Sequence, residues 1–448
     1  MKNIFKIFAV SLALVAGSCN FIDPELNVDP NNPLDVSMNL LLPQTETSIA
    51  YVLGGDLNRY TSMWTQHHSG VERQSASYEV YQVKENDVNN AWGNIYAGAL
   101  QDLKIIMAKA TETESPHYRG VARVLTAFMV GNVVDLWNDI PYSDALKGAE
   151  QLKPTYDSGS SVYDQIQAML RDAKVDLGTA ASSFTPGSDD LVYGGDLDKW
   201  IALANTLLAR NYLHVGDYSS ALNAINDGAI ADNGGNAMVD FGNGPTEQNP
   251  WYQFEDQRGD VVMGKFFIDL LVSINDPRLP YFATKDQAGG YSGAAAGVPN
   301  TTVSRFGPYY GSADSPVPFA TYAETKFIEA EAAFPTNKSA AADAYNAGIA
   351  ASLDQLGIDD AAFLAQEAAD QNSITLEKIM THKYIACYTT LETFTDWRRT
   401  GIPALQPAAG TTQIARRFPY PGDERLYNNA NWSPYSSVTV FDKVFWDN

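Results

Sequence analysis

The fold is decided by the segment at residues 197–230, which reads LDKWIALANTLLARNYLHVGDYSSALNAINDGAI. Its apolar residues recur at a spacing near 3.6, which predicts one helix over 197–215 and a second over 217–230. Gly216-Asp217 supplies the turn between them. The segment therefore predicts an antiparallel helical hairpin. Small residues that let the two helices approach closely are Ala202, Ala204, Ala209, Ala221 and Ala224.

The same plan recurs at residues 320–334 and 339–353, on either side of a turn around Pro335. These pairs resemble tetratricopeptide-type (TPR) hairpins, but the chain has no strict repeat of about 34 residues. Ordinary antiparallel helix pairs therefore stay an alternative. We expect a mainly α fold built on a TPR-like scaffold of helical hairpins. Helical spacing is also present at residues 91–110, 117–137, 160–178, 359–369 and 373–399.

Other regions lack helical spacing. Residues 232–260 are rich in Gly, Asn and Asp, and residues 284–318 form a long stretch of Gly, Ala, Ser and Pro. A loop this long inside a compact body is usually functional or mobile. The chain closes with an irregular aromatic tail over 416–448. We expect one domain over 37–448, whose loop-rich half carries the ligand and comprises insertions near 60–90, 232–318 and 400–448.

The N-terminus carries a targeting signal. Lys2 and Lys6 provide positive charge, and the apolar stretch Ile4 to Ala16 has 13 residues, too few for a bilayer span of about 20. The small residues before Cys19 suit bacterial lipoprotein processing, although the usual Leu three positions earlier is absent. We expect a signal peptide over 1–18, with ordinary secretion as the alternative. Lipidated Cys19 would then anchor the body through an acidic, Pro- and Asn-rich tether over 19–36.

The composition excludes several classes of partner. The chain has 448 residues, with 30 Lys+Arg against 53 Asp+Glu, for a net charge of −23. This balance argues against nucleic acid and against docking on anionic lipid, because both need a positive surface. It fits neutral or cationic ligands better than anionic ones. The 24 Tyr and 8 Trp residues indicate much amphipathic contact surface, as in proteins that bind neutral polar ligands.

No catalytic, cofactor or metal signature is present in the sequence. A Gly-x-Ser-x-Gly elbow, a P-loop, an HExxH motif and a Rossmann glycine pattern are all missing. His67 and His68 are adjacent, and neighbours at that spacing point to different faces, which makes a poor metal chelate. We therefore expect a protein that is not an enzyme and has no cofactor. An α/α-barrel glycosidase stays the enzyme alternative, since carboxylate separation cannot be read from sequence.

Aromatic side chains in polar surroundings are the best candidates for ligand contact. Apolar sugar faces stack on Trp and Tyr rings, while amides and carboxylates bind the hydroxyls, so a glycan site needs aromatics in loops. Trp137, Trp200, Trp397 and Phe128 lie in or beside helical stretches, so we expect them to be structural. For each candidate, packing that anchors a loop is an equally good interpretation. The candidates are Trp64, Gln66, Tyr78, Tyr81, Trp251, Tyr252, Tyr291, Tyr309 and Tyr310, and the polar residues Arg73, Gln74 and Asn89 lie near some of them in sequence.

Several motifs occur in an order typical of one family. They are Arg119 to Arg123 with Asp135 to Leu146, Gly195-Asp196 with Trp200 and Leu207 to Arg210, Asp276-Pro277-Arg278, Tyr322 to Glu324 with Glu329 to Ala332, Glu377-Lys378 with Asp396 to Arg399, and Arg417 to Pro421 with Glu424. In this order they resemble the starch-utilisation D-type (SusD/RagB) lipoproteins of the Bacteroidetes outer membrane. Lys378 departs from the family pattern, which has Arg there, and Thr395-Asp396-Trp397 is atypical.

The resemblance implies a SusD-like α-α superhelix with an irregular half that carries the ligand. It also implies a non-enzymatic role at the cell surface, facing the exterior. There the protein would cap a SusC-like TonB-dependent outer-membrane transporter and deliver oligosaccharides, or peptides as in RagB-like relatives. The family motifs lie on the scaffold, so the resemblance assigns no ligand residue. A peptide-binding lipoprotein therefore stays open beside the glycan binder.

Overall fold

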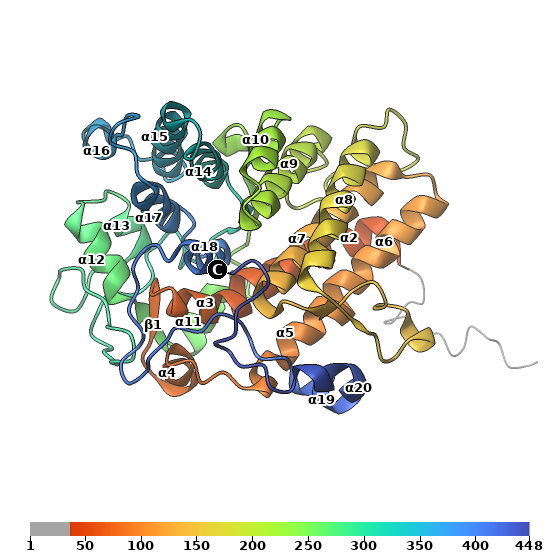
Figure 1. The fold of residues 1–448 in the computed structure, drawn as a ribbon, viewed down its shortest axis with the longest axis horizontal. Coiled ribbons are helices and arrows are strands. Elements are labelled where there is room, and N and C mark those ends of the chain that lie inside the picture. Colours follow the sequence, from red (N-terminus) through yellow and green to blue (C-terminus); the bar gives the residue numbers. More distant parts are fainter. Residues whose placement is uncertain (1–35, 448) are drawn as a thin grey trace, which may run out of the picture.

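The computed structural model describes residues 36–447. The predicted signal peptide, the Cys19 anchor and the tether up to residue 35 lie outside the described residues. Helices dominate the described part and the strands are short, as Figure 1 shows. The prediction of a mainly α fold is confirmed.

The scaffold is a row of antiparallel helices, in which each helix packs on the next. In Figure 1 the row runs as an arc from α6 at one side of the molecule to α15 at the other. Successive pairs form TPR-like hairpins, and their stacking gives the predicted superhelix. The members are α6 (Gln101–Glu112), α7 (Pro116–Trp137), α8 (Gly159–Leu177), α9 (Leu197–His214), α10 (Tyr218–Asn226), α14 (Tyr322–Ala333), α15 (Lys338–Asp354) and α17 (Leu376–Ala386).

The α9–α10 hairpin forms where the sequence predicts it. Gly216 has a φ of 75°, a left-handed conformation that glycine adopts without steric cost. The Asp217 side chain then accepts a hydrogen bond from the backbone N–H of Ser220 at 3.0 Å and so caps α10. Helix α10 ends at Asn226 rather than at residue 230. Asn205 explains the early end, because its amide donates to the carbonyls of Asp227 and Gly228 and holds the chain in a turn.

Two long helical stretches contain π-helical segments. In the first, α2 (Met38–Ile49) continues through η3 (Ala50–Leu57) into α3 (Asn58–Trp64), and in the second, α5 (Asn89–Gly93) continues through η5 (Asn94–Leu100) into α6. No helix was predicted over 38–64, where Pro43 lies inside α2. Position 54 in η3 packs closely against strand β6. A residue with a Cβ does not fit there, because that atom would lie 2.3 Å from Val317 Cγ1.

The irregular half combines short helices with three two-stranded antiparallel sheets. Strand β1 (His68–Gly70) pairs with β5 (Val261–Met263), β2 (Ile140–Pro141) with β3 (Tyr156–Asp157), and β4 (Ala237–Val239) with β6 (Val317–Ala320). The short helices are α4 (Arg73–Glu79), α11 (Pro250–Gln257), α12 (Lys265–Ser273), α13 (Leu279–Phe282), α16 (Ala361–Glu367), α18 (Glu392–Thr400), α19 (Gly422–Tyr427) and α20 (Asn429–Trp432), with 3-10 turns η4 (Glu85–Val88), η6 (Gly148–Glu150), η7 (Asn233–Gly235) and η8 (Ser433–Tyr435).

Three expectations about secondary structure need correction. The region 232–260 is not wholly irregular, because Asn249 caps helix α11 by accepting from the N–H groups of Trp251 and Tyr252. The predicted helix 373–399 is two helices, α17 and α18, separated by a turn in which Thr389 has a φ of 66°. The tail 416–448 contains the short helices α19 and α20. Such short helices lack the apolar periodicity that a sequence pattern can detect.

Helix α7 is the only helix in residues 36–447 that is long and apolar enough to cross a membrane. Its most apolar window is 89% buried inside the protein. Helix α7 therefore belongs to the core, where it packs against α6 and α8. Trp137, Trp200, Trp397 and Phe128 are all buried, so their structural assignment is confirmed.

Candidate functional site

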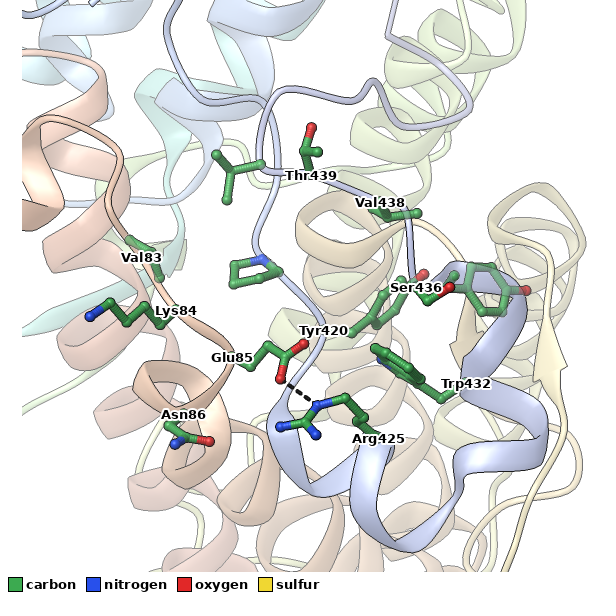
Figure 2. A pocket seen from close by; sticks show the side chains of 13 residues that line it. Val83, Lys84, Glu85, Asn86, Tyr420, Arg425, Trp432, Ser436, Val438 and Thr439 are labelled. Carbon is green, nitrogen blue, oxygen red and sulfur yellow. Dashed lines mark hydrogen bonds and ion pairs between the residues drawn. The ribbon is translucent and has the colours of Figure 1, made fainter.

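An open hollow of about 430 Å³ lies between residues 83–86 and the C-terminal tail. Figure 2 shows the two sides facing each other, with Trp432 on the tail and Arg425 of α19 reaching toward Glu85. The two segments are more than 300 residues apart in sequence, so only the fold brings them together.

The carboxylate of Glu424 is one centre of the contacts that hold the tail in place. Glu424 accepts a hydrogen bond from the Tyr156 hydroxyl at 2.7 Å and one from the Asn428 amide at 2.9 Å, and Trp92 Nε1 donates to it at 3.4 Å. Asn431 adds a bond to the Lys153 carbonyl at 2.9 Å. These contacts tie α19 and α20 to the β3 strand and to α5, and so fix the tail wall of the hollow.

The tail wall is aromatic. The half-buried Tyr435 ring stacks on Tyr156 with centroids 4.8 Å apart and packs at 5.2 Å on Tyr420. Burial and the charge of Asp139 raise the pKa of the Tyr435 hydroxyl to about 12, so this hydroxyl stays protonated at neutral pH. Trp432 is half-buried beside it, and its Nε1 has no hydrogen-bond partner among the described residues. The wall therefore offers aromatic ring surface, while the Trp432 Nε1 itself is buried.

The opposite wall is polar. Arg425 Nε donates to Glu85 Oε2 at 2.8 Å, and the two side chains are 44% and 37% exposed. Exposed ion pairs contribute at most about 1 kcal/mol, so a ligand can displace this one at small cost. Glu85 is the only carboxylate among the lining residues. Most glycoside hydrolases need two carboxylates that flank the glycosidic bond. The lining of this hollow has only one, together with aromatic and polar side chains that can bind a sugar.

The comparisons with known proteins decide the family. A family model described as "Starch-binding associating with outer membrane" matches residues 30–421. The chain belongs to the SusD-like family. A search of curated protein sequences gave no match.

Solved structures of SusD-like proteins share the fold. A SusD/RagB family protein from Bacteroides thetaiotaomicron is 22% identical with a TM-score of 0.81, covering 92% of this chain and 99% of that one. A structure described as a chitin-binding protein is 23% identical with a TM-score of 0.79, covering 92% and 100%. A chitin-binding SusD homolog from Flavobacterium johnsoniae is 22% identical with a TM-score of 0.78, covering 92% and 97%.

The SusD-like motifs meet in one buried ionic network. Arg210 of α9 donates to Glu324 of α14 through Nε at 2.7 Å and Nη2 at 2.8 Å. Arg399 of α18 donates to Glu331 at 2.9 Å, and Lys383 lies 2.7 Å from Asp396. A buried charge without a partner is costly. The pairs between α9 and α14 and between α18 and α14 therefore join family motifs that lie 114 and 68 residues apart in this chain.

The closing motif also completes the core. The Trp137 indole donates to the Pro419 carbonyl at 2.8 Å, and the Tyr420 hydroxyl donates to the Asp139 carbonyl at 2.8 Å. The tail that forms the hollow is thus docked onto the end of α7. The other motif turn, Asp276 with Arg278, is a fully buried ion pair in which Arg278 also donates to Ser352 at 2.8 Å.

Several predicted ligand residues lie in the core. Trp64 is fully buried, and its indole donates to the Tyr78 carbonyl at 2.9 Å. Trp251 is 2% exposed and packs on Phe306 and His68. Four candidates that we expected in loops lie on helices instead: Trp64 on α3, Tyr78 on α4, and Trp251 and Tyr252 on α11. With no exposed ring face, Trp64 and Trp251 are not part of the candidate surface.

The remaining predicted residues occupy two regions. Gln66 and Tyr81 are buried next to the 406–408 segment, where Gln66 donates to the Gln406 carbonyl at 2.5 Å and the Tyr81 hydroxyl accepts from the Ala408 N–H at 3.0 Å. Tyr291, Tyr309 and Tyr310 pack on a second hydrophobic cluster around α12 and α13. Tyr310 is buried there, while Tyr291 and Tyr309 are half-buried. None of the predicted residues lines the hollow at the tail.

Sequence reasoning missed the residues that form the hollow. Trp432, Tyr435 and Arg425 lie in the tail, which the sequence marked only as irregular and aromatic. An aromatic residue in polar surroundings was the signal for a ligand contact, and Trp432 carries it because Asn, Ser and Pro are its neighbours.

Proposed function

We propose that this chain is a lipoprotein on the exterior face of the outer membrane that captures oligosaccharides and delivers them to a partner SusC-like TonB-dependent transporter. The family supports carbohydrate binding at the outer membrane. The observation that carries the proposal is the tail hollow, whose lining combines the aromatic residues Trp432 and Tyr435 with amide, hydroxyl and guanidinium groups and a single carboxylate. Sugars present an apolar face and a rim of hydroxyls, and this arrangement complements both.

Binding to a panel of oligosaccharides and peptides by isothermal titration calorimetry tests the proposal. The panel includes chitooligosaccharides, since two structural neighbours are described as chitin-binding. We expect Trp432→Ala to weaken the best glycan roughly tenfold, because ring stacking contributes on the order of 1–2 kcal/mol. The matched control is Tyr427→Ala, an aromatic residue of α19 that is 71% exposed and does not line the hollow.

Two outcomes would overturn the proposal. Failure to bind any glycan would remove the nutrient-binding role, and binding of peptides alone would replace it with the peptide-binding alternative. Turnover of a bound glycan that depends on one carboxylate would instead favour a glycosidase.

The anchor and the partner need separate tests. Cys19→Ser should abolish incorporation of labelled fatty acid and release the protein from the outer membrane. Protease treatment of intact cells should cleave the wild-type protein if it faces the exterior. Co-purification with an outer-membrane transporter after mild solubilisation tests the delivery role, and consistent failure to recover one would count against it.

A further inference from the structure

A larger hollow, of about 800 Å³, lies at the N-terminal end of the described chain. Its walls are the start of α2, the end of α6 and the segment around Phe184. Helices α2 and α6 pack on each other, and Figure 1 shows them side by side at one end of the helical arc. The hollow shares no lining residue with the tail hollow, so the two are separate surfaces.

This hollow exposes large apolar side chains. Leu40 on α2 is 62% exposed and Phe184 is 57% exposed, and both line the hollow together with the buried Tyr118. Apolar side chains that gather on one surface mark a contact site, whereas single exposed ones need no explanation. Lys109 and Glu112 place one charge of each sign in the lining. The hollow therefore fits an apolar occupant and does not select for charge.

Phe184 is fixed in its exposed position by hydrogen bonds. Its backbone N–H donates to Ser115 Oγ at 3.2 Å, and its carbonyl accepts from Ser182 Oγ at 2.5 Å. The hydroxyl of the next residue, Thr185, lies 2.9 Å from His117 Nδ1. Ser115 and His117 lie at the start of α7. The helical scaffold therefore holds the segment that presents the Phe184 ring to solvent.

The chain itself supplies an apolar segment next to this hollow. Val36, the first described residue, is part of the lining, so the predicted tether joins the body at the hollow. Residues 20–35 separate Cys19 from Val36, and their large apolar residues are Phe21, Ile22, Leu26, Val28 and Leu34. A segment attached by a short linker has an effective concentration in the millimolar range. Even a weak contact between this segment and the hollow is therefore populated.

We propose that this hollow binds the protein's own tether, with Val28 and Leu34 packed against Leu40 and Phe184. A second copy of the chain is a poorer occupant, because both copies carry a net charge of −23 and repel each other. Docking leaves only residues 20–27 as a free leash, which keeps the body near its anchor and limits its rotation over the membrane. The inference does not depend on glycan binding.

Hydrogen exchange on the mature lipoprotein in nanodiscs tests the inference. We expect the amides of residues 28–35 to exchange at least about tenfold more slowly than those of an unfolded chain. Phe184→Ser and Leu40→Ser should each remove most of this protection, because they remove the apolar surface of the hollow. Both side chains are exposed, so the core stays intact in these variants. The matched control is Leu152→Ser, since Leu152 is 76% exposed and lies outside the hollow.

Two results would overturn the inference. One is exchange of residues 28–35 at the rate of an unfolded chain in the wild-type protein. The other is protection that persists in both Phe184→Ser and Leu40→Ser, because the tether would then be held by the membrane or by another surface.

Cross-linking on intact cells gives a second, independent measurement. Val28→Cys combined with Phe184→Cys should form a disulfide on mild oxidation, because a disulfide needs Cα atoms within about 7 Å of each other. Val28→Cys combined with Leu152→Cys should not. Cys387 is buried and does not compete. Equal cross-linking in the two pairs would show that the tether has no preferred site and would count against the inference.

Discussion

Removing the Glu424 carboxylate should loosen the tail that forms the hollow without unfolding the helical scaffold. Glu424 accepts hydrogen bonds from Tyr156 at 2.7 Å and Asn428 at 2.9 Å, with a longer one from Trp92 at 3.4 Å. Hydrogen bonds to a charged group contribute roughly 1.5–3 kcal/mol each. Two good bonds at the low end give about 3 kcal/mol. Glu424 is half-buried, so solvent screening reduces this to about 2 kcal/mol.

The effect should be local because the other bonds between tail and scaffold, such as Asn431 to the Lys153 carbonyl and Arg425 to Glu85, remain in the variant. In Glu424→Ala we expect amide hydrogen exchange across residues 420–440 to accelerate about 30-fold, the equivalent of about 2 kcal/mol. Helices α7 to α9 should keep wild-type protection. Calorimetry should show a parallel loss of glycan affinity, because Trp432 and Tyr435 are no longer held in place.

The control is the neighbouring acid. Asp423 is exposed and accepts a single hydrogen bond from the Asn89 amide at 3.2 Å. Asp423→Ala should therefore change stability by less than about 0.5 kcal/mol. Wild-type exchange across 420–440 and unchanged glycan affinity in Glu424→Ala would refute the reasoning about the tail.

Two further predictions concern stability. Asp276→Ala leaves Arg278 buried without its ion-pair partner, so urea denaturation should show a loss of about 3–5 kcal/mol; a loss below about 1 kcal/mol would contradict this. Burial raises the pKa of Glu79 from 4.5 to about 7. The protonated form is thus favoured in the folded state, and the stability contribution of Glu79 is complete below pH 4.5 and lost as the pH rises to about 7. Relative to Glu79→Gln, the wild-type protein should lose about 3 kcal/mol over that range, and parallel pH profiles in urea denaturation would disprove the assignment.

The sequence predicted the long helices because their signal is local and repeated. Apolar residues at a spacing near 3.6 continue over about five or six turns in α7, α8 and α9, and Gly216-Asp217 marks the turn into α10. The helices over 38–64 gave no such signal. Their π-helical segment changes the period, and Pro43 and the Gly54-Gly55 pair resemble helix breaks.

The ligand residues could not be predicted in the same way. Trp64 and Tyr78 lie in similar polar sequence contexts, yet Trp64 is fully buried and Tyr78 lines a hollow. The difference comes from which distant segments cover each ring. Phe418 and Phe394 pack on Trp64 from more than 300 residues away, and no local pattern contains that information.

The sequence by itself determined the helical class, the hairpin scaffold and the SusD-like family, because periodicity and ordered motifs are properties of the chain. Only the tertiary structure decided which aromatic rings stay accessible. The reason is that burial depends on packing between remote segments. Asp260 is withdrawn from solvent while Arg258 remains exposed, and Glu85 meets Arg425 across 340 residues.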